Sequence, residues 1–185
     1  MKTLNIITLI LVILIVIVTL MIILFKYFIE KLNNINNLLV DTEKECIDEL
    51  KRKNEIIEKM IKVSNNKFKC ESTAFDEVKD LEIDCLDSFK DEKKLNKCYE
   101  EILHLVEDNP KSKDIKTLKD YIKKYDNNEL KIISLRTFYN KYTLEYNNMI
   151  KKVPYNIISK FKKFKIKNII EGKELDINFN NDLEV

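Results

Sequence analysis

An uninterrupted apolar stretch, residues 4–25, constrains the fold of this chain more than any other part of the sequence. Its 22 residues include only three polar side chains, Asn5, Thr8 and Thr19, and lysines flank it at positions 2 and 26. A helix of that length is about 33 Å long at about 1.5 Å per residue, which matches a hydrocarbon core of about 30 Å. We therefore predict a transmembrane anchor over residues 1–26.

A cleaved secretory signal is the alternative explanation of this stretch. The apolar region of such a signal runs for about 7–15 residues and ends in small residues. Here the run is longer and ends in Phe25, Lys26 and Tyr27. The first cysteine is Cys46, too far along the chain for lipoprotein processing. We therefore expect a single-pass protein of the cell membrane that keeps this helix.

The orientation in the membrane follows from the flanking lysines. Lys2 precedes the apolar stretch, whereas Lys26 and Lys31 follow it. Because basic residues favour the cytoplasmic side, we expect the rest of the chain to be cytoplasmic. Cysteines remain thiols there but can pair if exported. The sequence leaves the state of all four open: Cys46, Cys70, Cys85 and Cys98.

The remainder of the chain carries helix-period stripes. The first includes Phe28, Leu32, Ile35, Leu39, Cys46, Leu50, Ile57 and Met60, with Thr42 and Lys53 in the gaps. This spacing predicts that the membrane helix continues to residue 63. A second stripe comprises Val78, Leu81, Cys85, Phe89, Leu95, Tyr99, Ile102 and Val106. It predicts a helix over residues 73–108, starting at a sequence that resembles a capping box. At residues 90–94 the stripe thins to charged residues, so any break in this helix is expected there.

The third stripe has a seven-residue repeat. It comprises Leu118, Tyr125, Ile132, Tyr139, Tyr146 and Val153, and Pro154 ends it. Such a repeat predicts a helix over residues 113–153 that packs on its neighbours in coiled-coil fashion. We therefore predict an all-α fold: the transmembrane helix, an antiparallel bundle of three long helices, and a short fourth helix. The expected domains are the anchor (1–26), the bundle (27–165) and a tail (166–185).

Charged residues beside the repeat are candidates for an internal polar layer. Three antiparallel segments imply that the third long helix runs parallel to the first. That arrangement brings Glu129 and Arg136 near the basic pair on the first helix, Arg52 and Lys53, with Glu45 or Glu49 as the carboxylate for Arg136. The layer would fix helix register more than it would add stability. The alternative is a polar pocket for a ligand.

A basic stretch follows the repeat. No acid lies between Glu145 and Glu171, whereas seven lysines do: Lys151, Lys152, Lys160, Lys162, Lys163, Lys165 and Lys167. One interpretation is an amphipathic helix on an anionic membrane surface. The other is a fourth helix that closes the bundle, with lysines in solvent. We favour the second, because the bundle must be capped somewhere. The expected topology also puts these lysines about 50 Å from the membrane, which further weakens the first interpretation.

Little in the sequence indicates catalysis. The single Gly excludes glycine-rich phosphate loops, and one histidine, His104, with no CxxC pair leaves little for a metal or redox site. The net charge of +2 indicates no nucleic-acid partner. We expect no enzyme, no catalytic residue, no cofactor and no metal.

Three segments of the chain carry patterns found together in one known family. Residues 50–61, LKRKNEIIEKMI, are similar to the LKRR-x-DLIPNLV segment of the LemA family of bacterial membrane proteins, and residues 107–136 to its segment that begins E-x-YP. Residues 136–154 are similar to R-x2-YN-x5-YN-x2-I-x2-FP. The chain departs at Glu58 (family Pro), Val153 (Phe) and Lys163 (Gly), and residues 70–97 align with nothing in the family. The resemblance implies a single-pass membrane protein with a long helical body and carries over no active site.

Two classes of function therefore remain open. The first is a membrane-anchored interaction module or envelope scaffold, whose partners are the lipid bilayer and an unknown protein. The second is a membrane-bound hydrolase or redox enzyme. An enzyme would require a concave site that gathers two or more titratable groups. The oligomeric state is open.

Overall fold

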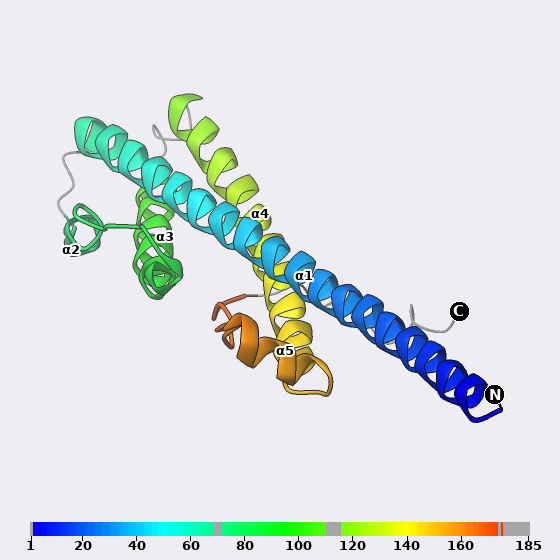
Figure 1. Ribbon diagram of the computed structural model, residues 1–185. Coiled ribbons are helices and arrows are strands. Elements are labelled where there is room, and N and C mark those ends of the chain that lie inside the picture. The colour runs from blue at the N-terminus through cyan, green and yellow to red at the C-terminus, as the bar shows by residue number, and fades with distance from the viewer. Residues whose placement is uncertain (1, 69–71, 110–115, 174, 176–185) are drawn as a thin grey trace. The chain divides into compact units, whose positions relative to one another are not determined.

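The computed structural model describes residues 2–68, 72–109, 116–173 and 175 (Figure 1). Within these ranges it is all-helical, as the sequence predicts. The elements are α1 (Lys2–Phe68), α2 (Thr73–Asp76), the 3-10 helix η1 (Leu86–Asp91), α3 (Glu92–Asp108), α4 (Lys116–Met149) and α5 (Tyr155–Lys162). The chain forms two compact units, unit 1 from residues 1–39 and 142–168 and unit 2 from residues 40–141 and 169–185. Cys70 and Pro110 lie outside the described residues.

Helix α1 joins the apolar stretch to the charged part of the chain without a break, as predicted, and it extends five residues beyond residue 63. Its buried positions include Leu32, Leu39, Leu50, Ile57 and Met60 of the predicted stripe. The large apolar side chains of residues 6–25, in contrast, are 42–63% exposed. The Thr19 hydroxyl donates to the Ile15 and Val16 carbonyls, so this polar group is satisfied within the helix. By length and composition, α1 is the one described helix that could cross a membrane.

The predicted helix over residues 73–108 is wrong in its first half. The Ser72 hydroxyl accepts a hydrogen bond from the Ala74 amide and caps α2, which ends after four residues. An irregular passage and η1 follow, and only from Glu92 onward does α3 continue as an α-helix. In the passage the Ser88 hydroxyl bonds the Asp84 amide and the Glu82 carbonyl, so a side chain replaces helical backbone partners. The departure from α-helix thus begins at residue 77, earlier than we expected, and ends at Asp91, within the charged stretch 90–94 where we expected a break.

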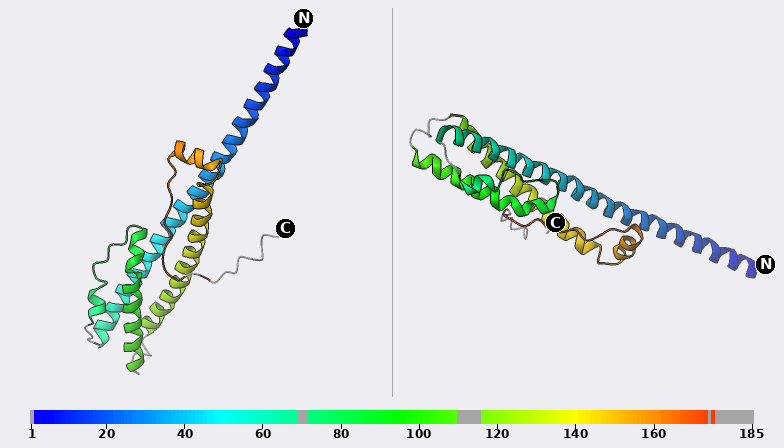
Figure 2. Two further views of the ribbon diagram at one scale, coloured as in Figure 1. Left: turned by 90° about the horizontal axis from the view of Figure 1, so that it is seen from below. Right: turned by 90° about the vertical axis from the view of Figure 1, so that its left-hand side faces the viewer.

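This irregular passage changes the direction of the later helices of unit 2. Lys53 contacts Glu92, and Ser72, just after α1, contacts Glu101, so α3 runs parallel to α1. Helix α4 runs antiparallel to both α1 and α3 (Figure 2). Further along α4 the partners lie earlier in α3, from Tyr99 to Glu92, and earlier in α1, from Lys53 to Glu45. The prediction that the third long helix is parallel to the first is therefore wrong. The physical reason is that residues 77–91 already bring the chain back along α1.

The seven-residue repeat forms the buried face of α4. Leu118, Tyr125, Ile132, Tyr139 and Tyr146 are each at most 3% exposed, as predicted for core positions. The last member, Val153, is instead 73% exposed, because α4 ends at Met149. The predicted fourth helix is present as α5, directly after Pro154, and Ile158 is buried in it.

The segment after α5 is bound by side chains of α4. In unit 1 the Asn147 amide pairs with both backbone groups of Lys167, at 2.8 and 3.0 Å. In unit 2 the Asn140 amide does the same with Ile170, at 2.7 and 2.8 Å. The Thr137 hydroxyl also accepts from the Leu175 amide. Side chains of α4 therefore hydrogen-bond the backbone of the predicted tail at several positions in its described part, residues 166–173 and 175.

Candidate functional site

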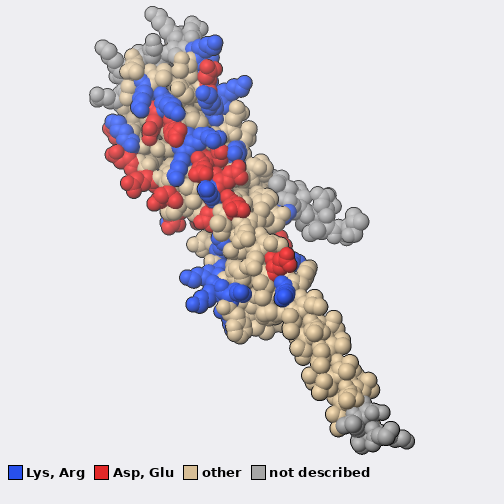
Figure 3. All heavy atoms as spheres, turned by 45° about the horizontal axis from the view of Figure 1, so that its top comes forward, with Lys and Arg blue, Asp and Glu red and all other residues tan. Residues whose placement is uncertain are grey.

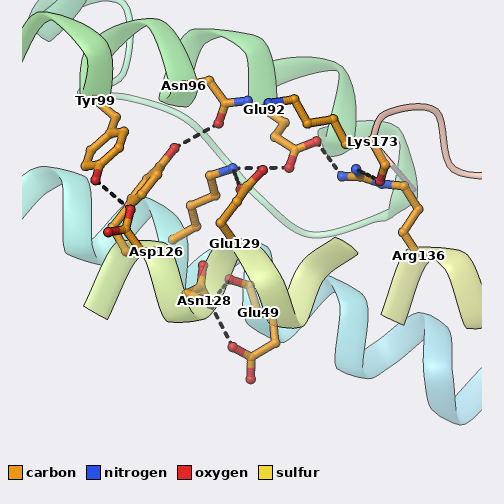
Figure 4. Close-up of polar contacts among 11 residues, drawn as sticks. Glu49, Glu92, Asn96, Tyr99, Asp126, Asn128, Glu129, Arg136 and Lys173 are labelled. Carbon is orange, nitrogen blue, oxygen red and sulfur yellow. Dashed lines mark hydrogen bonds and ion pairs between the residues drawn. The ribbon is translucent and has the colours of Figure 1, made fainter. Parts of the chain in front are cut away.

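Four charged side chains of unit 2 form an ion-pair layer, which we call the buried ion-pair layer: Lys53, Glu92 and Arg136, which are buried, and Glu129, which is half-buried (Figure 4). Lys53 on α1 is fully buried. Its ammonium lies 3.1 Å from Glu92 Oε1 at the start of α3 and also contacts Glu129 Oε2 on α4. A buried charge is tolerated when opposite charges and hydrogen bonds surround it. The layer therefore joins all three helices through one lysine.

Arg136 forms the other half of the layer. Its Nη2 lies 2.5 Å from Glu92 Oε2, and its Nη1 donates to the Lys173 carbonyl at 2.8 Å. The guanidinium also lies 5.3 Å from the centre of the Phe89 ring, within the range of a cation–π contact. Glu92 thus uses one oxygen for each cation. Two cations and two carboxylates leave the layer with no net charge.

The single glycine of the chain lies against this layer. Gly172 has φ +139°, a backbone conformation that side-chain-bearing residues rarely adopt. A Cβ at this position would collide with the Arg136 guanidinium. The segment therefore needs glycine here for two reasons, its conformation and its close approach to Arg136.

An aromatic pair covers one side of the layer. The rings of Tyr99 and Tyr125 are stacked with their centres 3.7 Å apart, and the Lys53 ammonium lies 5.2 Å from the Tyr125 ring. The Tyr125 hydroxyl donates to Asn96 and the Tyr99 hydroxyl to Asp126, at 2.8 and 2.7 Å (Figure 4). Burial is the main reason why the pKa of Tyr125 is raised above its usual 10. Both phenols therefore act as neutral hydrogen-bond donors.

A second polar cluster of unit 2 is centred on Glu49. Its buried carboxylate accepts from the Asn128 amide at 2.8 Å and from the Lys131 ammonium at 2.8 Å. Arg52 lies 3.1 Å away on the same helix, but its side chain is 63% exposed. Lys131 also pairs with Glu45. This cluster fixes α4 on α1 at the edge of solvent.

The structure brings together some of the residues predicted for the polar layer and separates others. Lys53 and Glu129 are in direct contact, and Arg136 is buried beside them. The carboxylate of Arg136 is Glu92, not Glu45 or Glu49, because α4 runs opposite to the predicted direction. Arg52 lies outside the layer, in the Glu49 cluster.

Glu92 is the site residue that the sequence analysis missed. Its position follows from the buried stripe of α3: Leu95, Cys98 and Ile102 are fully buried, and one step of three residues back from Leu95 gives Glu92. The charged neighbours at positions 90–94 obscured this regularity. The signal available in the sequence was that the Glu92 carboxylate continues the apolar stripe of α3, which indicates a buried, paired acid.

The chemistry of these groups is restricted. Burial raises the pKa of Cys46 and of Cys98 to about 12, so both thiols stay protonated and weakly nucleophilic at neutral pH. Cys85 is exposed, although the predicted stripe placed it on a buried face. The free thiols among the described residues are Cys46, Cys85 and Cys98. His104 is exposed and lies 4.0 Å from Glu107 on its own helix. The described residues contain no group of three His, Cys, Asp or Glu side chains that could hold a metal ion.

Comparison with known families accounts for most of the chain. The model of the LemA family matches residues 43–179. This chain belongs to the LemA family. The match begins after the apolar stretch and spans the LemA-type bundle, including the whole ion-pair layer and Gly172. No curated protein and no solved structure matched the chain.

Family membership gives one sequence motif of this LemA protein, R-x2-YN-x5-YN, a structural meaning. Asn140 and Asn147, its two asparagines, hold the backbone of the segment after α5. They are seven residues apart and therefore lie on the same face of α4. Arg136, the first residue of that motif, is the cation held by Glu92 and by the Lys173 carbonyl.

Proposed function

We propose that this LemA-family chain is a membrane-anchored, non-catalytic interaction module whose helical body faces the cytoplasm. The observation that supports it best is the contrast along α1. The apolar side chains of residues 6–25 are exposed, whereas the later part of the same helix buries its stripe. Exposing so large an apolar surface to water is unfavourable, and a bilayer would cover it.

The internal polar groups favour interaction over catalysis. The buried carboxylates of unit 2, Glu49 and Glu92, are already held by cations. Exposed apolar side chains remain on α4, among them Leu130 and Leu144. Such side chains are suited to contacts with another protein, for example one that organises the cell envelope. A membrane-bound hydrolase or redox enzyme remains the alternative, but neither the paired carboxylates nor the high thiol pKa values favour it.

The anchoring part of the proposal is tested by extraction. Wild-type protein in isolated membranes is expected to resist alkaline carbonate and to dissolve only in detergent. Charging the stretch with Ile13→Lys and Ile17→Lys costs about 2.5–3.5 kcal/mol per lysine at a helix centre and should release the chain. Leu130→Lys, at an exposed apolar position of unit 2, serves as the matched control and should stay in the pellet. Release of the wild type by carbonate would contradict membrane anchoring.

The orientation is tested with Cys85, because Cys46 and Cys98 are buried. In a Cys70→Ser background, a membrane-impermeant maleimide should label Cys85 only after the cells are opened. Labelling of intact cells would place the body outside. A Cys85→Ser control should remain unlabelled in both states and would identify the labelled thiol.

The interaction part requires a partner to be found at a defined surface. A photoreactive amino acid at Leu130 or Leu144, introduced into the full chain in its native membrane, should form a discrete cross-linked adduct with another protein. The control position is the exposed Lys93 on α3. Equal, diffuse products from all three positions would argue against a partner on α4.

A further inference from the structure

Unit 1 carries a surface that combines exposed apolar and basic side chains. Its members are Val153, Ile157, Phe161 and Ile166 with Lys160, Lys162, Lys163 and Lys165, all exposed. Phe161, at the centre, is 79% exposed. We call this set the basic–apolar surface. The surrounding sequence, residues 146–170, contains no acid.

The exposure of this surface is fixed by the fold of unit 1. Helix α5 buries Ile158, so Ile157 and Phe161, four residues apart, form a separate exposed row. Lys163, with φ 57°, ends the helix in a left-handed turn, closed by a hydrogen bond from the Phe164 amide to the Ser159 carbonyl. Asn147 holds the following backbone at Lys167. Both ends of the surface are therefore tied to unit 1.

One contact places this surface beside the end of the apolar stretch. The ring of Tyr155, the first residue of α5, packs edge-on against Phe28 of α1, with centres 5.1 Å apart. Phe28 lies three residues beyond Phe25, a rise of about 4.5 Å along the helix. Figure 3 shows the uncharged stretch of α1 and a group of basic side chains close to its end. The expected topology put these lysines about 50 Å from the membrane, whereas the contact of Tyr155 with Phe28 shows that α5 begins beside the apolar stretch.

We propose that the basic–apolar surface docks into the headgroup layer of the bilayer that α1 crosses and binds anionic lipids there. The proposal rests on membrane anchoring by α1. Lysines near an anionic leaflet are attracted to phosphate groups, and apolar side chains beside them enter the boundary of the acyl region. The surface matches this chemistry because it has one sign of charge and an exposed aromatic ring. A bundle-closing helix would instead have buried Ile157 and Phe161.

The chain has no tryptophan, so single-tryptophan variants of the full chain can report depth in the membrane. Three variants are reconstituted into vesicles of brominated phosphatidylcholine, with or without phosphatidylglycerol: Phe161→Trp reports docking, Ile15→Trp insertion of α1, and Leu130→Trp the solvated body. Bromine quenches only tryptophans that reach the acyl region. We expect quenching of about twofold for Phe161→Trp in anionic vesicles and less in neutral ones. Ile15→Trp should be quenched in both and Leu130→Trp in neither.

The outcomes separate docking from anchoring. Unquenched Phe161→Trp beside quenched Ile15→Trp overturns docking and leaves anchoring intact. Equal quenching of Phe161→Trp in both vesicle types overturns the role of anionic lipid. Quenched Phe161→Trp beside unquenched Ile15→Trp overturns anchoring and keeps the docking surface.

A charge variant provides a second measurement. In the Phe161→Trp background, exchanging Lys160, Lys162, Lys163 and Lys165 for Gln should abolish the difference between anionic and neutral vesicles. Exchange of the same four residues for Arg preserves the charge and should retain the difference. If the Gln variant keeps the full difference, the lysines do not bind the anionic lipid.

Discussion

The buried ion-pair layer of unit 2 and the basic–apolar surface of unit 1 both place charges against apolar groups, but they balance those charges differently. In the layer, two cations face two carboxylates and Lys53 and Arg136 are buried. On the surface, lysines stand without acidic neighbours in the sequence and are exposed. A buried charge must be compensated within the protein, whereas an exposed excess of one sign is free to attract a partner. The layer is therefore structural, and the surface is suited to binding.

The largest effect is expected from Glu92, because it compensates two buried cations. Glu92→Ala should lower the free energy of unfolding by about 3–5 kcal/mol, the usual cost of breaking a buried pair. Urea denaturation of the full chain in detergent, followed by helical circular dichroism, measures it. The adjacent Asp91→Asn breaks a part-exposed pair with Lys94 and should cost about 1 kcal/mol or less. Equal, small losses for both variants would mean that the layer is solvated.

A smaller effect is expected from Asn140, which satisfies both backbone groups of Ile170. Asn140→Ala leaves a buried donor and acceptor unpaired and should cost about 1–3 kcal/mol. The same denaturation experiment applies, and hydrogen exchange at the Ile170 amide should accelerate. The control is Asn148→Ala, an exposed asparagine of the same helix, which should change little. Unchanged exchange at Ile170 would show that the Asn140 amide does not hold this segment in place.

A still smaller loss of stability is expected from Lys131, whose ion pairs with Glu45 and Glu49 lie at the solvent-exposed edge of unit 2. Lys131→Met should cost about 1 kcal/mol or less, because its side chain is 45% exposed. Hydrogen bonds to Glu49 and Glu45 raise the pKa of Lys131 above its usual 10.5. The folded state thus binds this proton more tightly than the unfolded state, so the stabilisation is complete below pH 10.5 and is lost as the pH rises through the raised pKa. A difference between variant and wild type that grows above pH 10.5 would contradict this assignment.

The smallest effect on stability is expected from the basic–apolar surface. Exchanging Lys160, Lys162, Lys163 and Lys165 together for Gln should change the free energy of unfolding by about 0.5 kcal/mol or less in neutral detergent, because exposed side chains away from special features contribute little. A loss comparable to that of Glu92→Ala would show that these lysines support the fold, and the distinction between the two regions would fail.

The sequence alone determined the features that depend on local periodicity. The apolar stretch predicted one long first helix, the seven-residue repeat predicted the buried row from Leu118 to Tyr146, and the stretch after Pro154 predicted a short fourth helix. Each depends on which side of a helix a residue occupies, and helical geometry fixes that within a few turns. Of the four residues predicted for the polar layer, Lys53 and Arg136 are buried, whereas Arg52 is exposed. The family resemblance, based on residues 50–61 and 107–154, was confirmed as well.

Only the tertiary structure decided how the helices pair. The direction of α3 and α4 depends on residues 77–91, where Ser88 and its backbone partners replace a helix that the apolar spacing predicted. Once that passage returns along α1, Glu92 rather than Glu45 or Glu49 meets Arg136. Within unit 1, only the fold shows that Tyr155 meets Phe28. Periodicity tells which face of a helix is buried but not which helix covers it. The partners of the buried charges and the place of the basic–apolar surface therefore depended on the topology.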